Sequence, residues 1–179
     1  MTALLRIDKL ARLMAVDLQF IEPWLLAEQR ESLTGRMSLA NMSRLKSLLG
    51  DENGSVDYRL DFGRDEQGQA YIEGEISATL TLICQRCMDP VNVHLQNKIN
   101  IGIVVDKTEA EQLPRHLEPL IPTDSHISLP SLLEDEILLG LPMAPAHKID
   151  QCPSRQLIKD YTVKKHNPFE ALKDLKSKS

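Results

Sequence analysis

The chain has 179 residues, of which 42% are hydrophobic and 26% charged, as in an ordinary globular protein with one main domain. A formal charge of −5 and an aromatic content of 4% argue against a protein that coats nucleic acid or stacks single-stranded bases. Charges interrupt the apolar N-terminus, and no apolar run approaches the roughly 20 residues of a membrane-spanning helix. With three cysteines, an odd number, these features predict a soluble cytoplasmic protein in a reducing compartment.

The first fifty residues have a helical pattern. Pro23 is placed to begin a helix through "PWLLAEQRESL", because its fixed φ suits the first helical turn. Ser38 is placed to cap a second helix that ends at Gly50. The apolar face of that helix would hold residues spaced mostly three apart, namely Leu39, Met42, Leu45, Leu48 and Leu49.

From residue 55 onward, apolar and polar residues alternate, which is typical of strands with one buried face. The alternation predicts three strands, over residues 55–62, 70–84 and 91–105. Long strands joined by short turns favour an antiparallel sheet whose apolar face is covered by helices. The predicted fold class is therefore α+β, with an antiparallel sheet of at least three long strands that could curl toward a barrel, packed helices and a mobile C-terminal tail.

Residues 106–128 are rich in Pro, Glu and His and are expected to form a loop. A helix is expected next, because Ser131 and Glu134 have the spacing of a capping box and an apolar stripe continues to Leu141. Pro142 would end it. The three consecutive acids 134–136 do not form a metal site, because neighbouring helical residues point about 100° apart. They are expected to have a structural role, and Glu134 is also a candidate cap.

We expect residues 1–158 to form one α+β domain with N-terminal helices, and residues 159–179 to form a basic tail with a short helix. The tail contains six lysines and three acids, although the whole chain is acidic. It is either a solvated terminus or a contact for rRNA or a partner protein. The candidate contact residues are Lys164, Lys165, Asn167, Phe169, Leu172, Lys173 and Lys176.

Two cysteines, Cys84 and Cys87, lie three residues apart in "LICQRCMDPV", where the second predicted strand ends. Two thiolates that project from such a turn can chelate one metal ion. His147 and Cys152 would complete a set of four zinc ligands, and His94 is a substitute ligand. Zinc is therefore the candidate cofactor.

Two other interpretations of the cysteine pair stay open. Cys84 has the same strand parity as Leu80 and Leu82, so it would also suit the core of the domain. A redox pair usually has its first cysteine at a helix N-terminus, whereas strand patterns lie on both sides of this one. Metal ligands, buried thiols and a redox pair therefore remain three alternatives.

Several segments in a fixed order carry a resemblance to a known family. They are "LTGRMSLANMSRLKSLL", "LDFGRDEQGQAYIEGEISATLTL", "CQRCMDPV", "LEDEILLGLPMAPAH" with a cysteine soon after it, and the closing "NPFEALKDLK". Together they resemble the YceD family, the large ribosomal RNA subunit accumulation proteins of bacteria and plastids. The resemblance extends from about residue 10 to the end of the chain. Some relatives carry a second cysteine pair where this chain has His147 and Cys152.

The resemblance implies a role in the synthesis, processing or stability of large-subunit (23S) rRNA, and hence in ribosome biogenesis. The resemblance brings no established catalytic activity with it, and the lack of a long apolar run predicts no membrane partner. We therefore expect a non-enzymatic factor that binds a precursor of the large ribosomal subunit or an rRNA-processing protein. The alternatives are a zinc-binding adaptor with an indirect effect on rRNA and a thiol–disulfide oxidoreductase.

Overall fold

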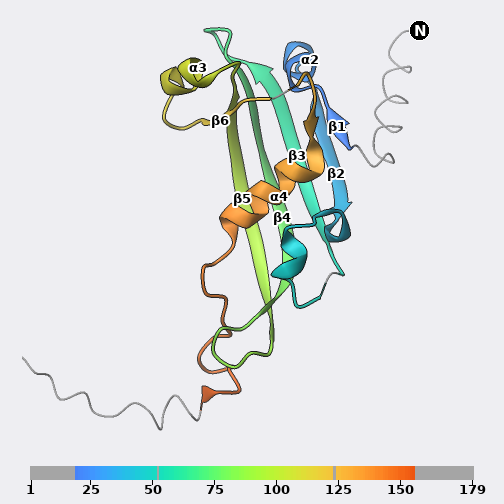
Figure 1. Ribbon diagram of the computed structural model, residues 1–179, viewed down its shortest axis with the longest axis vertical. Coiled ribbons are helices and arrows are strands. Elements are labelled where there is room, and N and C mark those ends of the chain that lie inside the picture. The colour runs from blue at the N-terminus through green and yellow to red at the C-terminus, as the bar shows by residue number, and fades with distance from the viewer. Residues whose placement is uncertain (1–18, 52, 123, 156–179) are drawn as a thin grey trace, which may run out of the picture.

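The computed structural model describes residues 19–51, 53–122 and 124–155. Five strands form one curved sheet in the order β2-β3-β4-β5-β6 (Figure 1). Their bounds are β2 (Ser32–Ser38), β3 (Ser55–Arg64), β4 (Ala70–Ile83), β5 (Pro90–Ile103) and β6 (Glu118–Leu120). Neighbouring strands are antiparallel except β5 and β6, which are parallel. The α+β class and the long antiparallel strands are thus confirmed, but the described sheet is open and has two edges rather than curling into a barrel.

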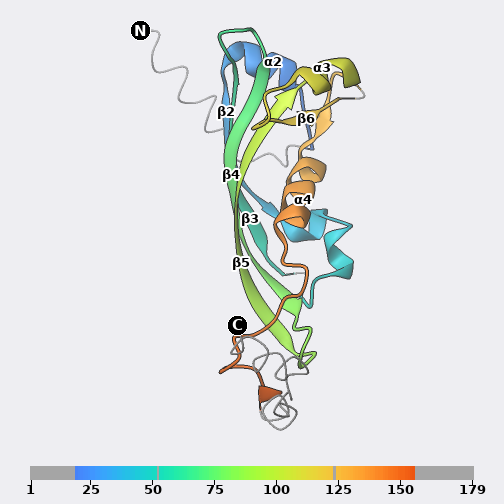
Figure 2. The same cartoon turned by 90° about the vertical axis from the view of Figure 1, so that its left-hand side faces the viewer.

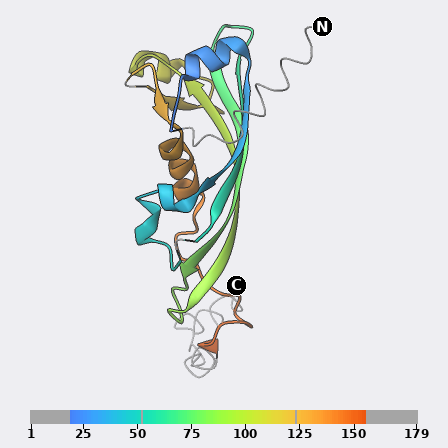
Figure 3. The ribbon, with the colours of Figure 1, turned by 90° about the vertical axis from the view of Figure 1, so that its right-hand side faces the viewer.

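The three strands predicted from alternation are β3, β4 and β5. β4 and β5 have 14 residues each and pair along their whole length, from Ala70 opposite Ile103 to Ile83 opposite Pro90. Helices cover the concave face of the sheet (Figures 2 and 3). Side chains of the covered face are fully buried, among them Leu60, Ile72, Ile76, Leu80, Ile99 and Ile103.

The helix α4 (Leu129–Gly140) lies on this covered face and contacts β5 and β4. Its apolar stripe, with Leu129, Leu133 and Ile137 fully buried, is the reason that it packs on the sheet. The predicted capping box is wrong. The N-cap is Ser128, whose Oγ accepts a hydrogen bond from the backbone N–H of Ser131 at 3.3 Å. Glu134 is therefore available for a contact with another element.

The N-terminal helices are shorter than predicted. The helix α2 (Pro23–Gln29) begins at Pro23 as expected, but Arg30 follows it in the left-handed region, with φ 52, and residues 32–38 form β2. The second predicted helix is replaced by two 3₁₀ turns, η1 (Leu39–Asn41) and η2 (Leu45–Ser47). Ser38 does cap the first turn, because its Oγ accepts from the N–H of Ala40.

Residues 106–128 are not simply a loop. They contain α3 (Lys107–Gln112), capped by Asp106, then β6, and then β7 (Ile127–Ser128), which pairs with β1 (Phe20–Ile21). Within the part of the chain that the structure describes, no helix is both long and apolar enough to cross a membrane. The predicted boundary at residue 158, the basic tail and its contact residues lie outside the described residues, so those predictions stay untested.

Candidate metal centre

Two segments that are far apart in sequence meet at one end of the long β4–β5 hairpin (Figure 1). The first is the turn after β4. Within it, the N–H of Cys84 donates to the carbonyl of Asp89, and the N–H of Met88 donates to the carbonyl of Cys84, both at 2.9 Å. Met88 has a left-handed backbone with φ 64. This turn brings the thiols of Cys84 and Cys87 together.

The second segment follows α4 and is joined to this turn by hydrogen bonds. The N–H of Gln85 donates to the carbonyl of Pro145 at 2.8 Å. The guanidinium of Arg86 donates to the carbonyl of His147, and the hydroxyl of Ser154 donates to the carbonyl of Arg86 at 3.4 Å. These contacts place residues 145–154 alongside the cysteine turn.

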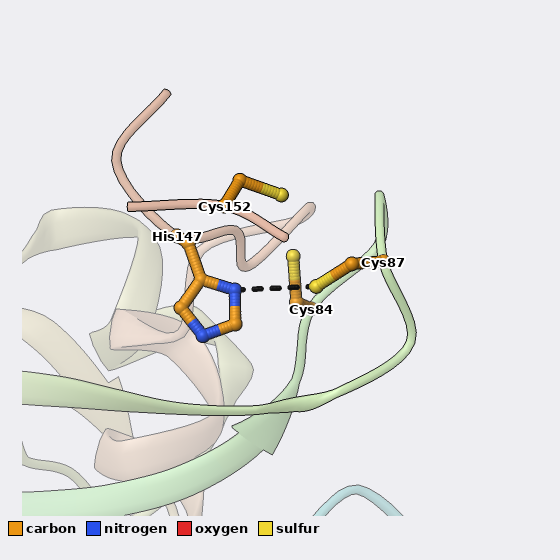
Figure 4. A group of neighbouring side chains, drawn as sticks. All are labelled: Cys84, Cys87, His147 and Cys152. Carbon is orange, nitrogen blue, oxygen red and sulfur yellow. Dashed lines mark hydrogen bonds between the residues drawn. The ribbon is translucent and has the colours of Figure 1, made fainter. Parts of the chain in front are cut away.

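The structure brings all four predicted metal ligands together (Figure 4). The sulfurs of Cys84, Cys87 and Cys152 and a ring nitrogen of His147 all lie within 4.8 Å of one another. The sulfur of Cys87 is 3.3 Å from Nδ1 of His147. Cys84 and Cys152 are buried, whereas Cys87 and His147 are half-buried. The predicted substitute, His94, is exposed on β5 beside Thr79 and is not part of this group.

The surroundings of the cysteines affect their ionisation in opposite directions. Burial opposes ionisation of Cys84, but hydrogen bonds from the backbone N–H groups of Cys87, His147 and Arg86 outweigh it and lower the pKa of Cys84 to about 5. Burial raises the pKa of Cys87 to about 11, and the neighbouring thiols of Cys84 and Cys152 add to this increase. The group therefore favours one thiolate and resists a second one.

A low thiol pKa is what the oxidoreductase alternative predicts for Cys84. A redox cysteine must also be reached by its disulfide substrate. Cys84 is 0% exposed, so its sulfur cannot be attacked without opening of the turn. The arrangement suits a ligand or a core thiol better than a redox nucleophile.

Two of the three acidic residues 134–136, Glu134 and Asp135, share the side chain of Arg44 as a partner. One carboxylate oxygen of Glu134 accepts hydrogen bonds from the backbone N–H groups of Arg44 at 2.6 Å and Leu45 at 3.0 Å. The Arg44 side chain binds the other oxygen of Glu134 at 2.9 Å and Asp135 at 2.6 Å. Glu136 is buried, which is the main cause of its raised pKa, together with the charges of Glu118 and Asp135.

The contact between Arg44 and Glu134 could not be found in the sequence, because the two residues are 90 positions apart and no local pattern links them. Glu134 was predicted to cap its own helix, but it instead accepts hydrogen bonds from the N–H groups at the start of η2. Through its contacts with Glu134 and Asp135, the Arg44 side chain joins η2 to α4.

Comparison with known proteins shows the family of the chain. The family model described as "Large ribosomal RNA subunit accumulation protein YceD" matches residues 72–176, which is more than half of the sequence and includes both segments of the cysteine–histidine group. The chain belongs to the YceD family. The YceD protein of Haemophilus influenzae, which carries the same description, is 28% identical over 165 residues, covering 88% of this chain and 95% of the relative. No solved structure matches this YceD family member.

Proposed function

We propose that the chain promotes the accumulation of large-subunit rRNA as a non-enzymatic ribosome-biogenesis factor. The observation that carries this proposal is the match to the Haemophilus influenzae protein named for that role. The match covers 88% of this chain and 95% of the relative, so it concerns nearly the whole of both proteins rather than one shared segment. The role named for the relative is therefore proposed for the whole chain.

The contacts of the acidic residues support binding rather than catalysis as the mode of action. Glu134 is hydrogen-bonded by two backbone N–H groups and a guanidinium, and Asp135 pairs with the same guanidinium. Carboxylates engaged in this way hold two elements together and are not available as a general base or as ligands for Mg²⁺. The proposed mechanism is binding to a precursor of the large subunit or to an rRNA-processing protein.

A partly apolar surface next to the candidate metal centre supports contact with a protein. A groove there is lined by Leu48, Leu138, Leu141, Pro142, Met143 and Pro145, among others. Of these lining residues, Leu48 is 47% exposed and Met143 is completely exposed. Exposed methionine and leucine side chains suit a protein surface, and the net charge of −5 disfavours broad contact with phosphates. The lysine tail remains the predicted contact with RNA.

Complementation tests the proposed function. A Haemophilus influenzae strain that lacks its YceD protein would express this chain, and the ratio of large-subunit to small-subunit rRNA would be measured. We expect the ratio to return to that of the parent strain. If the folded chain accumulates in the cells and the ratio stays low, the proposed function is wrong.

A paired set of variants tests the apolar surface. The double substitution Leu48→Glu with Met143→Glu should reduce co-sedimentation with large-subunit precursors at least tenfold, because it places charge on two exposed residues that line the groove. The control pair, Leu25→Glu with Val105→Glu, changes exposed apolar residues at the opposite end of the sheet. An equal loss of co-sedimentation in the two double variants would show that the groove is not the contact surface.

The cysteine–histidine group favours one alternative, a zinc-binding adaptor whose effect on rRNA is indirect. Such an adaptor would restore rRNA accumulation without co-sedimenting with precursor particles. The proposed factor should do both. Sucrose-gradient fractions from the complemented strain, probed for the chain, therefore separate the two functions.

A further inference from the structure

We propose that Cys84, Cys87, His147 and Cys152 bind one zinc ion, which fastens residues 142–155 to the end of the β4–β5 hairpin. This proposal concerns a structural metal and goes beyond the role in rRNA accumulation. It does not depend on that role.

The spacing of the four side chains fits a single tetrahedral ion. Zinc binds sulfur at about 2.3 Å and nitrogen at about 2.0–2.1 Å, so ligand atoms around it lie roughly 3.5–3.8 Å apart. In this structure all four ligand atoms lie within 4.8 Å of one another, and Cys87 and His147 are already 3.3 Å apart. Small side-chain rotations, on the order of 1 Å at the sulfurs, are sufficient to reach the zinc geometry.

The ligand types select the metal. Three thiolates and one imidazole form a closed structural zinc site, whereas Mg²⁺ and Ca²⁺ prefer oxygen ligands. Four protein ligands leave no open position for a water or a substrate. The site is therefore structural rather than catalytic.

The second ring nitrogen of His147 supports this assignment. Nε2 lies 3.1 Å from the carbonyl oxygen of Pro90, so it carries the proton and donates to that oxygen. Nδ1, which faces the sulfur of Cys87, then has a free electron pair. Metal-bound histidines are commonly fixed in this way by a carbonyl on the far nitrogen.

Backbone N–H groups and one cation balance the charge of the thiolates. The N–H groups of Cys87, His147 and Arg86 are directed at the sulfur of Cys84. A zinc ion with three thiolates carries a charge of about −1. The half-buried guanidinium of Arg86, which is bonded to the carbonyl of His147, adds a compensating positive charge.

The segment after α4 lacks apolar burial of its own, so a metal ion would supply its main attachment. Among residues 142–155, all of which the structure describes, Cys152 alone is buried, and Met143 and Ile149 are strongly exposed. A disulfide would account for two of the three sulfurs but not for the orientation of His147. Buried thiols without a metal would leave this segment attached by a few hydrogen bonds.

Metal analysis of full-length, tag-free protein prepared without chelator is the first test. We expect about one zinc per chain by mass spectrometry, and three sulfurs and one nitrogen around it by X-ray absorption. The three thiols should react with a thiol reagent only as zinc is released. Less than about 0.1 zinc per chain after growth in zinc-supplemented medium, or stoichiometric iron in its place, would overturn the proposal.

Variants identify the ligands. Because Cys84 and Cys152 are buried, their substitution tests folding as well as metal binding, so the half-buried ligands are compared instead, in Cys87→Ser and His147→Ala. Each should weaken zinc binding at least 100-fold in competition with a chelator. His94→Ala, at an exposed histidine outside the group, is the matched control and should leave the zinc affinity unchanged. Unchanged affinity in both ligand variants contradicts the site, whatever the outcome of the rRNA experiments.

Discussion

The covered middle of the sheet and its cysteine end are held together in different ways. In the middle, α4 packs on the strands through fully buried apolar residues such as Leu80, Leu133 and Ile137. At the cysteine end, a turn and an irregular segment meet through a few hydrogen bonds and four potential ligands. Apolar burial grows with the size of the packed layer, so a narrow end needs another source of stability. The chain therefore has a hydrophobic core in one place and, under the zinc proposal, a metal cross-link in the other.

A third kind of contact lies between these two regions. Arg44 and Glu134 join η2 to α4 through a carboxylate that is almost fully buried. The two backbone N–H groups that bond to Glu134 lose this acceptor if the carboxylate is removed. The stability of this contact depends on each donor having its acceptor. The stability of the apolar core depends on how fully the side chains fill the space between α4 and the sheet.

The largest expected effect is in the apolar core. Leu133→Ala removes a fully buried side chain from α4 and should lower the free energy of unfolding by about 3–4 kcal/mol, through lost burial and the cavity that remains. Urea unfolding monitored by circular dichroism measures it. Leu139→Ala, on the exposed side of the same helix, should change the free energy by less than about 0.5 kcal/mol. A similar loss in both variants would show that α4 is not packed on the sheet in this orientation.

Substitution in the contact between η2 and α4 should lower the free energy of unfolding by nearly as much. Glu134→Ala leaves the N–H groups of Arg44 and Leu45 unpaired and should cost about 3 kcal/mol in unfolding free energy. Asp135→Ala breaks only an exposed ion pair with Arg44 and should cost less than about 1 kcal/mol. Thermal unfolding of the two variants provides the comparison, and equal destabilisation would contradict the capping role of Glu134.

Removal of the proposed zinc should affect one region and spare the other. After chelation, amide hydrogen exchange in residues 84–90 and 145–152 should become at least 100-fold faster, because these segments lose their attachment. Exchange in residues 72–80 and 95–103 should stay the same, because the core holds those strands. Equal acceleration everywhere would show that the two regions are one cooperative unit.

A small gain in stability is expected in the cysteine turn. Met88 has φ 64, which is costly for a side chain with a Cβ atom, so Met88→Gly should raise the free energy of unfolding by about 0.5 kcal/mol. Gln85→Gly, in the same turn but without a positive φ, should lower it by a similar amount. Chemical denaturation distinguishes the two, and a loss in both would contradict the left-handed conformation of Met88.

The smallest effect concerns pH. Burial raises the folded-state pKa of Glu136, so its ionisation opposes folding as pH rises through that pKa, and the stability present in acid is lost. Glu136→Gln should therefore melt slightly higher than the parent protein at pH 7, and the difference should vanish near pH 4. Glu66→Gln, in an exposed turn, should show no difference at either pH. A gain for Glu136→Gln that persists at pH 4 would point to packing instead of charge.

The elements that the sequence predicted well have strong and regular patterns. Alternation from Val56 to Ile103 predicted three strands, and the apolar stripe predicted α4. Between Leu39 and Leu45 the buried residues recur every three positions, which suits a 3₁₀ helix as well as an α-helix. The sequence alone does not distinguish the two helix types, because the conformation depends on how these side chains pack against the sheet and α4.

Short strands and distant contacts were missed for a different reason. β2 has two buried apolar residues, Leu33 and Met37, which are too few for a periodic signal. The four candidate ligands, in contrast, were predicted from their residue types, although 60 positions separate the two halves of the group. Cysteine and histidine are chemically distinctive wherever they occur, whereas Arg44 and Glu134 are common surface residues whose pairing only the folded chain reveals.

The length of the β4–β5 hairpin sets the reach of the molecule. Fourteen residues in an extended strand span a contour of roughly 45 Å, about one and a half times the diameter of a small domain. The end that carries α2 and α3 and the end that carries the cysteines therefore present two separate footprints (Figure 1). A neighbour the size of one small domain covers only one of them, so a single copy is long enough to bridge two components that do not touch each other.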